Sequence, residues 1–365
     1  MKRLELLGKR LLRGTLRLAI HNKRREPGEI DPDQIRKILV VRQDNRIGNL
    51  VLQIPFIKGL RLAFPHAHIT ALLGATFANL YSGIPEIDDR IIYHHRELAR
   101  HPWKWLPFVL QLGKGDWDLA FECGHPQVVS LNNASLTCLS KAPFRVGFDR
   151  GDAGVFLNVL CCVPGRLHYA KAMAELIAPW RSDPAELEMS LPLPDSHRDA
   201  HRRVWERAGL EDDARVVLIW AGGRHDKRWE SGFWIRTAQT ITSAFSDHLT
   251  PVIGMGPGEV RLVAEFAAPP NVRTAIFDGP VEELWAFLDH CHAVISGDTG
   301  PMHLAVGLGV PTFTMFQVDN VWEYGHDDGN WHRAMLVRDA DPIPAVVDFL
   351  KTLPEGTCPR STISY

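Results

Sequence analysis

A glycine-flanked turn in the carboxyl half of the sequence carries the residue types that bind phosphate. Gly297-Asp298-Thr299-Gly300 follows the apolar run Ala293–Ser296 and precedes a helical pattern that starts at Pro301. The glycines permit a tight turn and a close approach of the backbone, and free N–H groups at a helix start attract an anion. We expect Asp298 or Thr299 to cap this helix. The turn is therefore a candidate diphosphate site.

Two further side chains have the chemistry to meet the same anion. His303 lies one turn into the helix and can face the turn, and Lys227 belongs to the charged run Arg224–Arg228. A lysine placed in advance stabilises the negative charge that develops on a departing phosphate oxygen, without reorganisation. An ordinary strand-to-helix connection and a solvated charged run are the alternative interpretations of these residues.

The elements that would position these residues alternate between short apolar runs and helical patterns. Strands are predicted at Lys37–Arg42, His68–Leu73, Arg90–Tyr93, Trp117–Glu122, Phe144–Phe148, Arg215–Trp220, Thr250–Gly254, Ala293–Ser296 and Pro311–Phe316. Helices are predicted at Leu50–Phe64, Phe233–Phe245, Glu259–Ala267, Val281–His290, Pro301–Gly307 and Pro344–Leu353. Such alternation predicts parallel sheets built from βαβ units, with ligands at the carboxyl ends of the strands.

The length of 365 residues fits two domains. We predict a basic segment at 1–30, an amino-terminal Rossmann-like domain at 31–190, a carboxyl-terminal Rossmann-like domain at 195–340, and a helix with a tail at 341–365. Leu191–Pro194 contains two prolines and is the predicted linker.

Composition excludes several classes of protein. Hydrophobic residues make up 45% and charged residues 23% of the chain, as in a soluble globular protein. No apolar run approaches the roughly 20 residues that cross a bilayer, and no signal peptide is evident, so we expect a cytoplasmic protein. The six cysteines contain no CxxC pair, which predicts reduced thiols. A net charge of −2 gives no global basic surface for nucleic acid.

The amino-terminal segment is basic and amphipathic. Residues 1–26 carry nine Lys/Arg against Glu5 and Glu26, a local charge of +7. Leucines at positions 4, 7, 11 and 18 form one helical stripe and the cations fill the opposite arc. This pattern predicts a helix on an anionic membrane surface. A helix docked on the protein itself and a frayed basic tail are the alternatives.

The string around the glycine-flanked turn resembles a known family. Gly297-Asp-Thr-Gly-Pro-Met-His-Leu-Ala305, followed by Gly309-Val-Pro311, is similar to the signature of glycosyltransferase family 9, the heptosyltransferases of lipopolysaccharide core assembly. Three further stretches resemble the family in the right order. They are the glycine loop Arg46–Pro55, the lysine motif Asp226–Glu230 with Trp234, and the nucleoside loop Gly254–Glu259.

The resemblance implies the GT-B arrangement of two facing Rossmann-like domains. It implies an ADP-heptose donor bound by the second domain, and inverting transfer to a lipid-linked saccharide acceptor bound by the first. Lys227 would neutralise the leaving diphosphate, and Glu259 would bind the ribose, although a plain helix-start carboxylate is the alternative there. No metal and no cofactor are expected. The expected donor-binding residues are Gly48, Gly222, Lys227, Glu259, Asp298, Thr299, Gly300 and His303.

One position departs from the family pattern. The family usually has an aspartate directly after its amino-terminal glycine, as the base that deprotonates the acceptor hydroxyl, and this sequence has Asn49 there. An amide does not accept that proton. We expect Asp44, in the same loop, to serve as the base, with Glu122 as a weaker candidate. Arg46 is a candidate contact for an anionic acceptor.

The sequence therefore favours an inverting glycosyltransferase that is peripheral at the inner face of the inner membrane. A transferase of the same fold with another donor or acceptor is the first alternative. A non-catalytic protein that binds nucleotide or glycolipid is the second, and Asn49 is its main support. A dinucleotide oxidoreductase is disfavoured because the first strand is not followed by G-x-G-x-x-G.

Overall fold

The computed structural model describes residues 22–181, 187–223, 227–245, 248–267, 272–338, 340–354 and 360–365. The predicted membrane-binding segment, residues 1–26, lies almost wholly outside the described residues, as do residues 224–226 of the charged run. The chain forms two compact units. Unit 1 contains the described residues up to Asn45 with Pro55–Ala78 and Pro85–Leu187, and unit 2 contains Arg46–Ile54, Asn79–Ile84 and Glu188–Tyr365.

Unit 1 is built on a six-stranded parallel sheet. The strand order is β3-β2-β1-β4-β5-β6, so the direction of winding reverses between β1 and β4. The strands are β1 (Lys37–Arg42), β2 (His68–Gly74), β3 (Asp89–Tyr93), β4 (Leu119–Glu122), β5 (Phe144–Phe148) and β6 (Val159–Cys161). The α-helices wholly within unit 1 are α4 (His95–Arg100), α5 (Trp105–Gly113), α6 (Leu131–Leu139) and α7 (Tyr169–Ala174).

The helix expected at Leu50–Phe64 is in fact two helices, α2 (Ile47–Val51) and α3 (Ile54–Ala63). Pro55 lies at the second position of α3, and a proline ring removes one helical hydrogen bond and clashes with the preceding turn. The break coincides with a boundary between the two units: α2 belongs to unit 2, and α3 from Pro55 onward belongs to unit 1.

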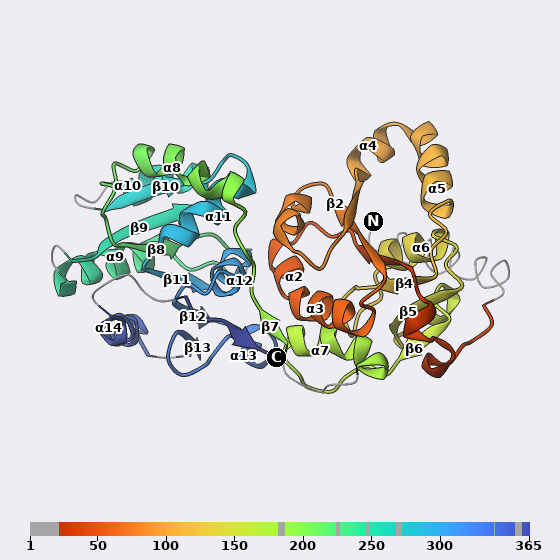
Figure 1. The fold of residues 1–365 in the computed structure, drawn as a ribbon. Coiled ribbons are helices and arrows are strands. Elements are labelled where there is room, and N and C mark those ends of the chain that lie inside the picture. Colours follow the sequence, from red (N-terminus) through yellow and green to blue (C-terminus); the bar gives the residue numbers. More distant parts are fainter. Residues whose placement is uncertain are drawn as a thin grey trace, which may run out of the picture. The chain divides into compact units, whose positions relative to one another are not determined.

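Unit 2 repeats the same topology. Its sheet is parallel, with the order β10-β9-β8-β11-β12-β13 and a reversal between β8 and β11. The strands are β8 (Val216–Trp220), β9 (Thr250–Met255), β10 (Arg273–Ile276), β11 (Ala293–Gly297), β12 (Thr312–Phe316) and β13 (His332–Leu336). Besides α2, the α-helices of unit 2 are α8 (Arg202–Arg207), α9 (Ser231–Phe245), α10 (Val263–Ala267), α11 (Val281–His290), α12 (Gly300–Gly307), α13 (Val321–Tyr324) and α14 (Ile343–Thr352). Figure 1 shows both sheets and the helices around them. The predicted α/β class is confirmed.

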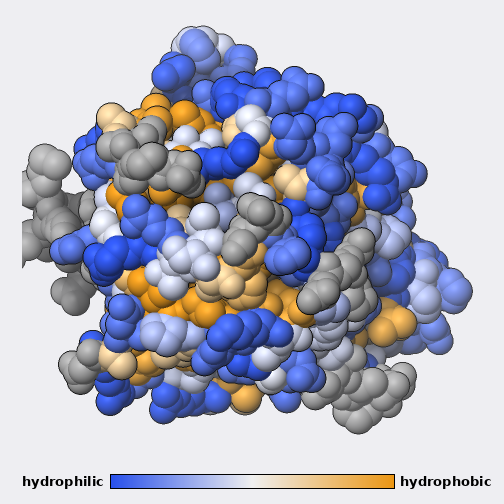
Figure 2. All heavy atoms as spheres, turned by 90° about the vertical axis from the view of Figure 1, so that its left-hand side faces the viewer, coloured by the Kyte–Doolittle hydropathy of each residue, from blue (hydrophilic) through white to orange (hydrophobic). Residues whose placement is uncertain are grey.

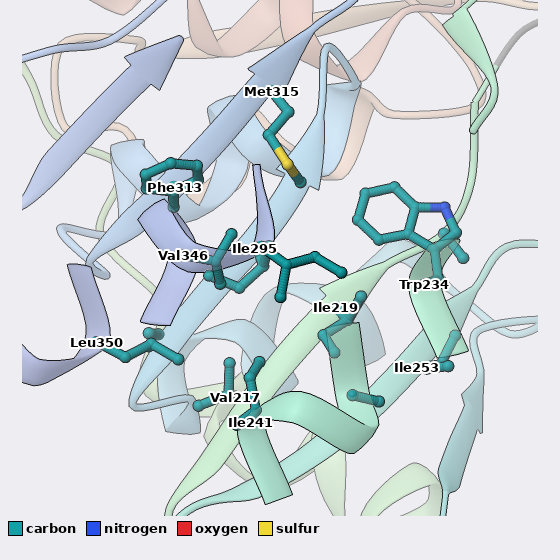
Figure 3. Packing of buried hydrophobic residues seen from close by; sticks show 14 of the residues in the cluster. Val217, Ile219, Trp234, Ile241, Ile253, Ile295, Phe313, Met315, Val346 and Leu350 are labelled. Atoms are coloured by element: carbon teal, nitrogen blue, oxygen red, sulfur yellow. The ribbon is translucent and has the colours of Figure 1, made fainter. Parts of the chain in front are cut away.

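The core of unit 2 lies between one face of the sheet and the helices α9 and α14. Figure 3 shows side chains from four neighbouring strands meeting side chains from these two helices. The labelled residues are Val217, Ile219, Ile253, Ile295, Phe313 and Met315 on strands, and Trp234, Ile241, Val346 and Leu350 on helices. The apolar contacts hold β8 and β11 in register, and these two strands carry the predicted donor loops at their carboxyl ends.

The segment predicted as the linker is packed against unit 2. Leu191 and Leu193 are buried, and the Leu191 N–H donates to the Gly307 carbonyl at 2.6 Å. Just before it, β7 (Glu188–Met189) pairs antiparallel with β14 (Ile363–Ser364). The face of unit 2 that Figure 2 shows is largely hydrophilic, with smaller hydrophobic areas between the polar residues.

Candidate functional site

The glycine-flanked turn joins β11 to α12 at the carboxyl edge of the unit 2 sheet. Asp298, Thr299 and Gly300 are partly exposed, whereas β11 and the rest of α12 are buried. Thr299 occupies the N-cap position but makes no side-chain cap hydrogen bond. Its hydroxyl instead pairs with the Ser296 hydroxyl at 2.9 Å. The capping prediction is therefore wrong for Thr299, and its side chain leaves the first-turn N–H groups of α12 uncapped.

Asp298 binds two side chains beside the turn instead of capping α12. Its Oδ2 accepts from Lys227 Nζ and from Asn320 Nδ2 at 2.9 Å. Lys227 Nζ also lies 5.7 Å from the centre of the Tyr324 ring, and the lysine side chain is 33% exposed. The structure thus brings Lys227 to the turn, 71 residues away in sequence, with its ammonium group fixed by an ion pair and an aromatic face.

His303 lies beneath the turn rather than on its surface. Burial lowers its pKa to about 4, so the imidazole is neutral near pH 7. Its Nδ1 pairs with His326 Nε2 at 2.7 Å, and His326 Nδ1 pairs with the Tyr365 hydroxyl. Burial raises the pKa of Tyr365 well above its usual value, so this hydroxyl keeps its proton. His303 is 4% exposed, and its contact with an anion stays a prediction.

The amino-terminal glycine loop packs against the same helix. A Cβ at Gly48 would lie 2.6 Å from His303 Cδ2, and a Cβ at Gly300 would lie 3.4 Å from the Gly48 nitrogen and collide with Ile47. Real Cβ atoms do not tolerate such contacts, so both glycines are needed for α2 to lie against α12. Gly48 and Asn49 thereby belong to the unit that carries the turn.

Glu259 lies at the carboxyl ends of β8 and β9. Its Oε1 accepts from Arg228 Nη2 at 2.8 Å. A Cβ at Gly222 would lie 3.2 Å from Glu259 Oε2, and a Cβ at Gly256 would lie 3.4 Å from the same oxygen. The two glycines leave room around this carboxylate, and Gly222 lies just after β8, on the opposite side of the chain reversal from the turn after β11. Such reversal points are where open α/β sheets bind ligands.

Asp44 lies in unit 1, two residues beyond β1, and Arg46 and Asn49 lie in unit 2. The Asp44 carboxylate pairs with the buried Arg42 at 2.9 Å and is 29% exposed. Arg42 in turn donates to the Tyr169 hydroxyl at 3.0 Å and to the Cys123 carbonyl. The structure therefore gives Asp44 a fixed and accessible position beside the reversal between β1 and β4.

Glu122, the weaker candidate for the base, is enclosed in unit 1. Its side chain is buried, and its Oε2 pairs with Arg150 Nη2 at 2.7 Å. Burial raises the pKa of Glu122, although the guanidinium of Arg150 opposes that shift. The Gly124 N–H donates to the other carboxylate oxygen at 3.1 Å. A carboxylate occupied in this way is suited to holding the loop after β4, not to meeting a substrate.

Asn320, Tyr324, His326 and Tyr365 surround the turn and its helix without having been predicted. They lie far along the chain from Lys227, and no short motif joins them. In the described part of the chain, no group of three or more His, Cys, Asp or Glu side chains is arranged to hold a metal ion. None of the described helices has the length and apolarity to cross a bilayer.

The comparisons with known proteins agree with this geometry. The sequence model of glycosyltransferase family 9 (heptosyltransferase) matches residues 280–326, which contain the turn and α12. A comparison with curated protein sequences gives no match.

Solved structures give the fold. A family 9 glycosyl transferase from Veillonella parvula DSM 2008 is similar, with a TM-score of 0.69 and 19% identity over 88% of this chain and 90% of that one. The ADP-heptose lps heptosyltransferase II of E. coli has a TM-score of 0.67 and 15% identity over 86% and 97% of the two chains. E. coli heptosyltransferase WaaC with ADP-2-deoxy-2-fluoro heptose has a TM-score of 0.64 and 18% identity over 86% and 99%. The resemblance of this chain to glycosyltransferase family 9, its GT-B fold and the glycosyltransferase class are thereby confirmed.

Proposed function

We propose that this protein transfers heptose from ADP-heptose, with inversion, to a lipid-linked saccharide such as a lipopolysaccharide core. The observation that carries the proposal is the turn Gly297–Gly300 with Lys227 beside it, within the stretch that matches the family. The structures of E. coli WaaC with ADP and with ADP-2-deoxy-2-fluoro heptose support the choice of donor, because those similar folds hold these compounds.

In this proposal the donor diphosphate binds at the start of α12. The first-turn N–H groups are not capped by Thr299, and the helix dipole favours an anion at that position. The Thr299 hydroxyl and Lys227 Nζ supply two further donors. As the bond from the sugar to the phosphate breaks, Lys227 offsets the charge that develops on the leaving oxygen. The protein supplies these cations and donors itself, so the proposed step uses no metal and no cofactor.

Glu259 and Gly222 are proposed to bind the nucleoside. Arg228 holds one carboxylate oxygen of Glu259 at 2.8 Å, which orients the other oxygen toward the space beside Gly222 and Gly256. A fixed carboxylate oxygen accepts hydrogen bonds from ribose hydroxyls, as the acidic residue does in other doubly wound sheets. His303 acts from below, by holding α2 against α12, and His326 fixes the orientation of its ring.

Asp44 is proposed as the base that deprotonates the acceptor hydroxyl, and Arg46 as a contact for an anionic acceptor. The ion pair with Arg42 orients the Asp44 carboxylate, and its position after β1 is where a ligand of unit 1 would bind. General-base catalysis typically contributes about 10²–10⁴-fold to the rate. Replacing Asp44 with asparagine is therefore expected to slow sugar transfer by that order while ADP binding is retained.

A nucleotide-binding protein without transfer activity is the second candidate, and Asn49 favours it. A screen of nucleotide diphosphate sugars with deacylated core oligosaccharide, read by product mass, separates the two. A mass increase of one heptose with ADP-heptose supports the proposal. Transfer of a sugar from another nucleotide sugar would show that this compound, and not ADP-heptose, is the donor. ADP binding without any product from the whole screen would favour the binding protein.

We further propose that the protein works at the cytoplasmic face of the inner membrane, held there by residues 1–26. The charge of +7 in that segment attracts anionic lipids, and a lipid-linked acceptor is presented at such a surface. Deleting residues 1–26 is expected to reduce sedimentation with anionic liposomes, and equal sedimentation of the deleted and full chains would refute the anchor.

A further inference from the structure

One helix of unit 1 is apolar on two sides. The stretch Pro102–Gly113, which contains α5, has only two polar side chains, Lys104 and Gln111. One side of α5 faces the unit 1 core, where Trp105 and Phe108 pack with the buried Leu112 against the sheet and α6. A helix that covers a core ordinarily has a polar outer side, so the composition of the other side requires an explanation.

The outer side of this helix is an exposed apolar stripe. The side chains of Trp103, Leu106 and Leu110 are 69%, 66% and 47% exposed. Leu106 and Leu110 lie on α5, and Trp103 lies in the 3-10 turn Pro102–Lys104 that leads into it. Their spacing of three and four residues places the three side chains on one helical face. Seven large hydrophobic side chains are markedly exposed among the described residues, and three of them lie in these eight positions. Contiguous exposed apolar side chains mark an interaction surface, whereas scattered ones do not.

Cations flank the stripe at both ends. Arg96 and Arg100 precede it, Lys104 lies next to Trp103, and Lys114 follows it, and all four are exposed. The only acidic residue from His94 to Lys114 is Glu97, which forms an ion pair with Lys104. The helices α4 and α5 lie at one edge of unit 1, beyond the ends of the strands (Figure 1). The apolar stripe is thus presented at an edge with a positive surround.

We propose that this stripe inserts into the interface of an anionic membrane, with Trp103, Leu106 and Leu110 in the acyl boundary and the flanking cations at the headgroups. An apolar helical face with tryptophan and leucine, bordered by Lys and Arg, is the composition of interfacial helices. The nine residues of α5 are too few to span a bilayer, so the helix lies on the surface. The cations argue against a second copy of this chain as the partner, because two such surfaces repel each other.

The proposal concerns described residues of unit 1 and is independent of the donor site and of residues 1–26. It gives unit 1, which is proposed to hold the acceptor, its own contact with the bilayer that carries a lipid-linked substrate. The test uses the full chain and vesicles of phosphatidylglycerol with phosphatidylcholine, or of phosphatidylcholine alone. The combined variant Trp103→Ser/Leu106→Ser/Leu110→Ser is expected to bind the anionic vesicles at least about tenfold more weakly than the wild type. Each of the replaced side chains buries apolar area in the membrane and so contributes to binding.

A matched control replaces two other exposed apolar residues of unit 1, Leu62→Ser/Val128→Ser, and is expected to bind as the wild type does. The melting temperatures of both variants should match the wild type, because the replaced side chains are exposed. Lipids brominated in their acyl chains provide a second readout. These lipids should quench part of the tryptophan fluorescence of the bound protein. Trp103→Phe should abolish this quenching, although ten of the eleven tryptophans remain.

Wild-type binding by the triple variant would overturn the proposal and leave residues 1–26 as the membrane contact. Unchanged vesicle binding together with loss of self-association in sedimentation would also overturn it, and would assign the stripe to a second copy. Equal loss of binding in the control variant would show that any exposed apolar residue has the effect, and would refute a dedicated surface.

Discussion

Replacing Lys227 with methionine is expected to weaken ADP binding by about 10- to 100-fold. Methionine keeps the length and most of the apolar stem of the lysine and removes only the charge and its donors. The ammonium group lies at the turn, bound to Asp298 and close to the Tyr324 ring. If the diphosphate occupies the start of α12, this group is a cation that the structure holds beside it.

The magnitude follows from the position of the side chain. Two unit charges 4 Å apart interact by about 4 kcal/mol at an effective dielectric constant of about 20. The Lys227 side chain is 33% exposed and already paired with Asp298, so solvent and the competing carboxylate reduce its gain from the diphosphate. About 1.4–2.8 kcal/mol remains, which is about a 10- to 100-fold change in Kd.

Titration calorimetry with ADP measures the change directly. Lys351→Met is the matched control, because Lys351 forms an ion pair with Asp348 at 3.5 Å on α14, and its removal should leave the Kd of ADP unchanged. Lys227→Met/Asp298→Asn removes both charges and should recover part of the lost affinity. An unchanged Kd in Lys227→Met would refute the assignment of the diphosphate to this turn.

Three further outcomes are expected. Burial lowers the pKa of His303 to about 4, so protonation stabilises the folded state less than the unfolded state, and about 3 kcal/mol of stability should be lost between pH 6.5 and 4. Urea unfolding of His303→Gln should lack this loss, and the same pH dependence in the variant and the wild type would contradict the explanation. Gly48→Ala should lower the free energy of unfolding by about 1–3 kcal/mol, because the added Cβ overpacks against His303. Gly258→Ala is the control, because a Cβ there meets open space, and it should leave the melting temperature nearly unchanged. Glu259→Gln should weaken ADP binding by about tenfold while leaving the Kd of inorganic pyrophosphate unchanged, and a parallel loss for both ligands would argue against a nucleoside contact.

The central strands of the two large sheets could be predicted from the sequence, but of their four edge strands only β3 could. All nine predicted strands are present. The strands of the two six-stranded sheets that were missed are β6, β10 and β13, and the short pair β7 and β14 was missed as well. β6, β10 and β13 each lie at the rim of a six-stranded sheet, where only one other strand of the sheet pairs with them. A strand covered on both faces needs a continuous apolar run, whereas a rim strand such as His332–Leu336 keeps polar residues and has no such signature.

The predicted site residues divide in the same way. The turn, Lys227 and Glu259 could be proposed as site residues from the sequence because a short motif surrounds each of them. Asn320 and His326 were not, because their roles arise only when the loop after β12 folds back over α12. The capping prediction was wrong for a related reason. Local sequence offers Asp298 and Thr299 as caps, but the folded chain pairs Asp298 with Lys227, 71 residues away, and Thr299 with Ser296, three residues earlier.

The position of α2 beside α12 offers a physical reason for an asparagine at position 49. Asn49 lies on α2. The residue before it, Gly48, lies against the start of α12. A carboxylate at position 49 would place a negative charge on an element packed beside the proposed diphosphate, where like charges repel. Asp44, five residues earlier, belongs to unit 1 and is held by Arg42 instead. If repulsion of the diphosphate is the reason for the asparagine, Asn49→Asp should raise the Kd of ADP in titration calorimetry, and an unchanged Kd would contradict this explanation.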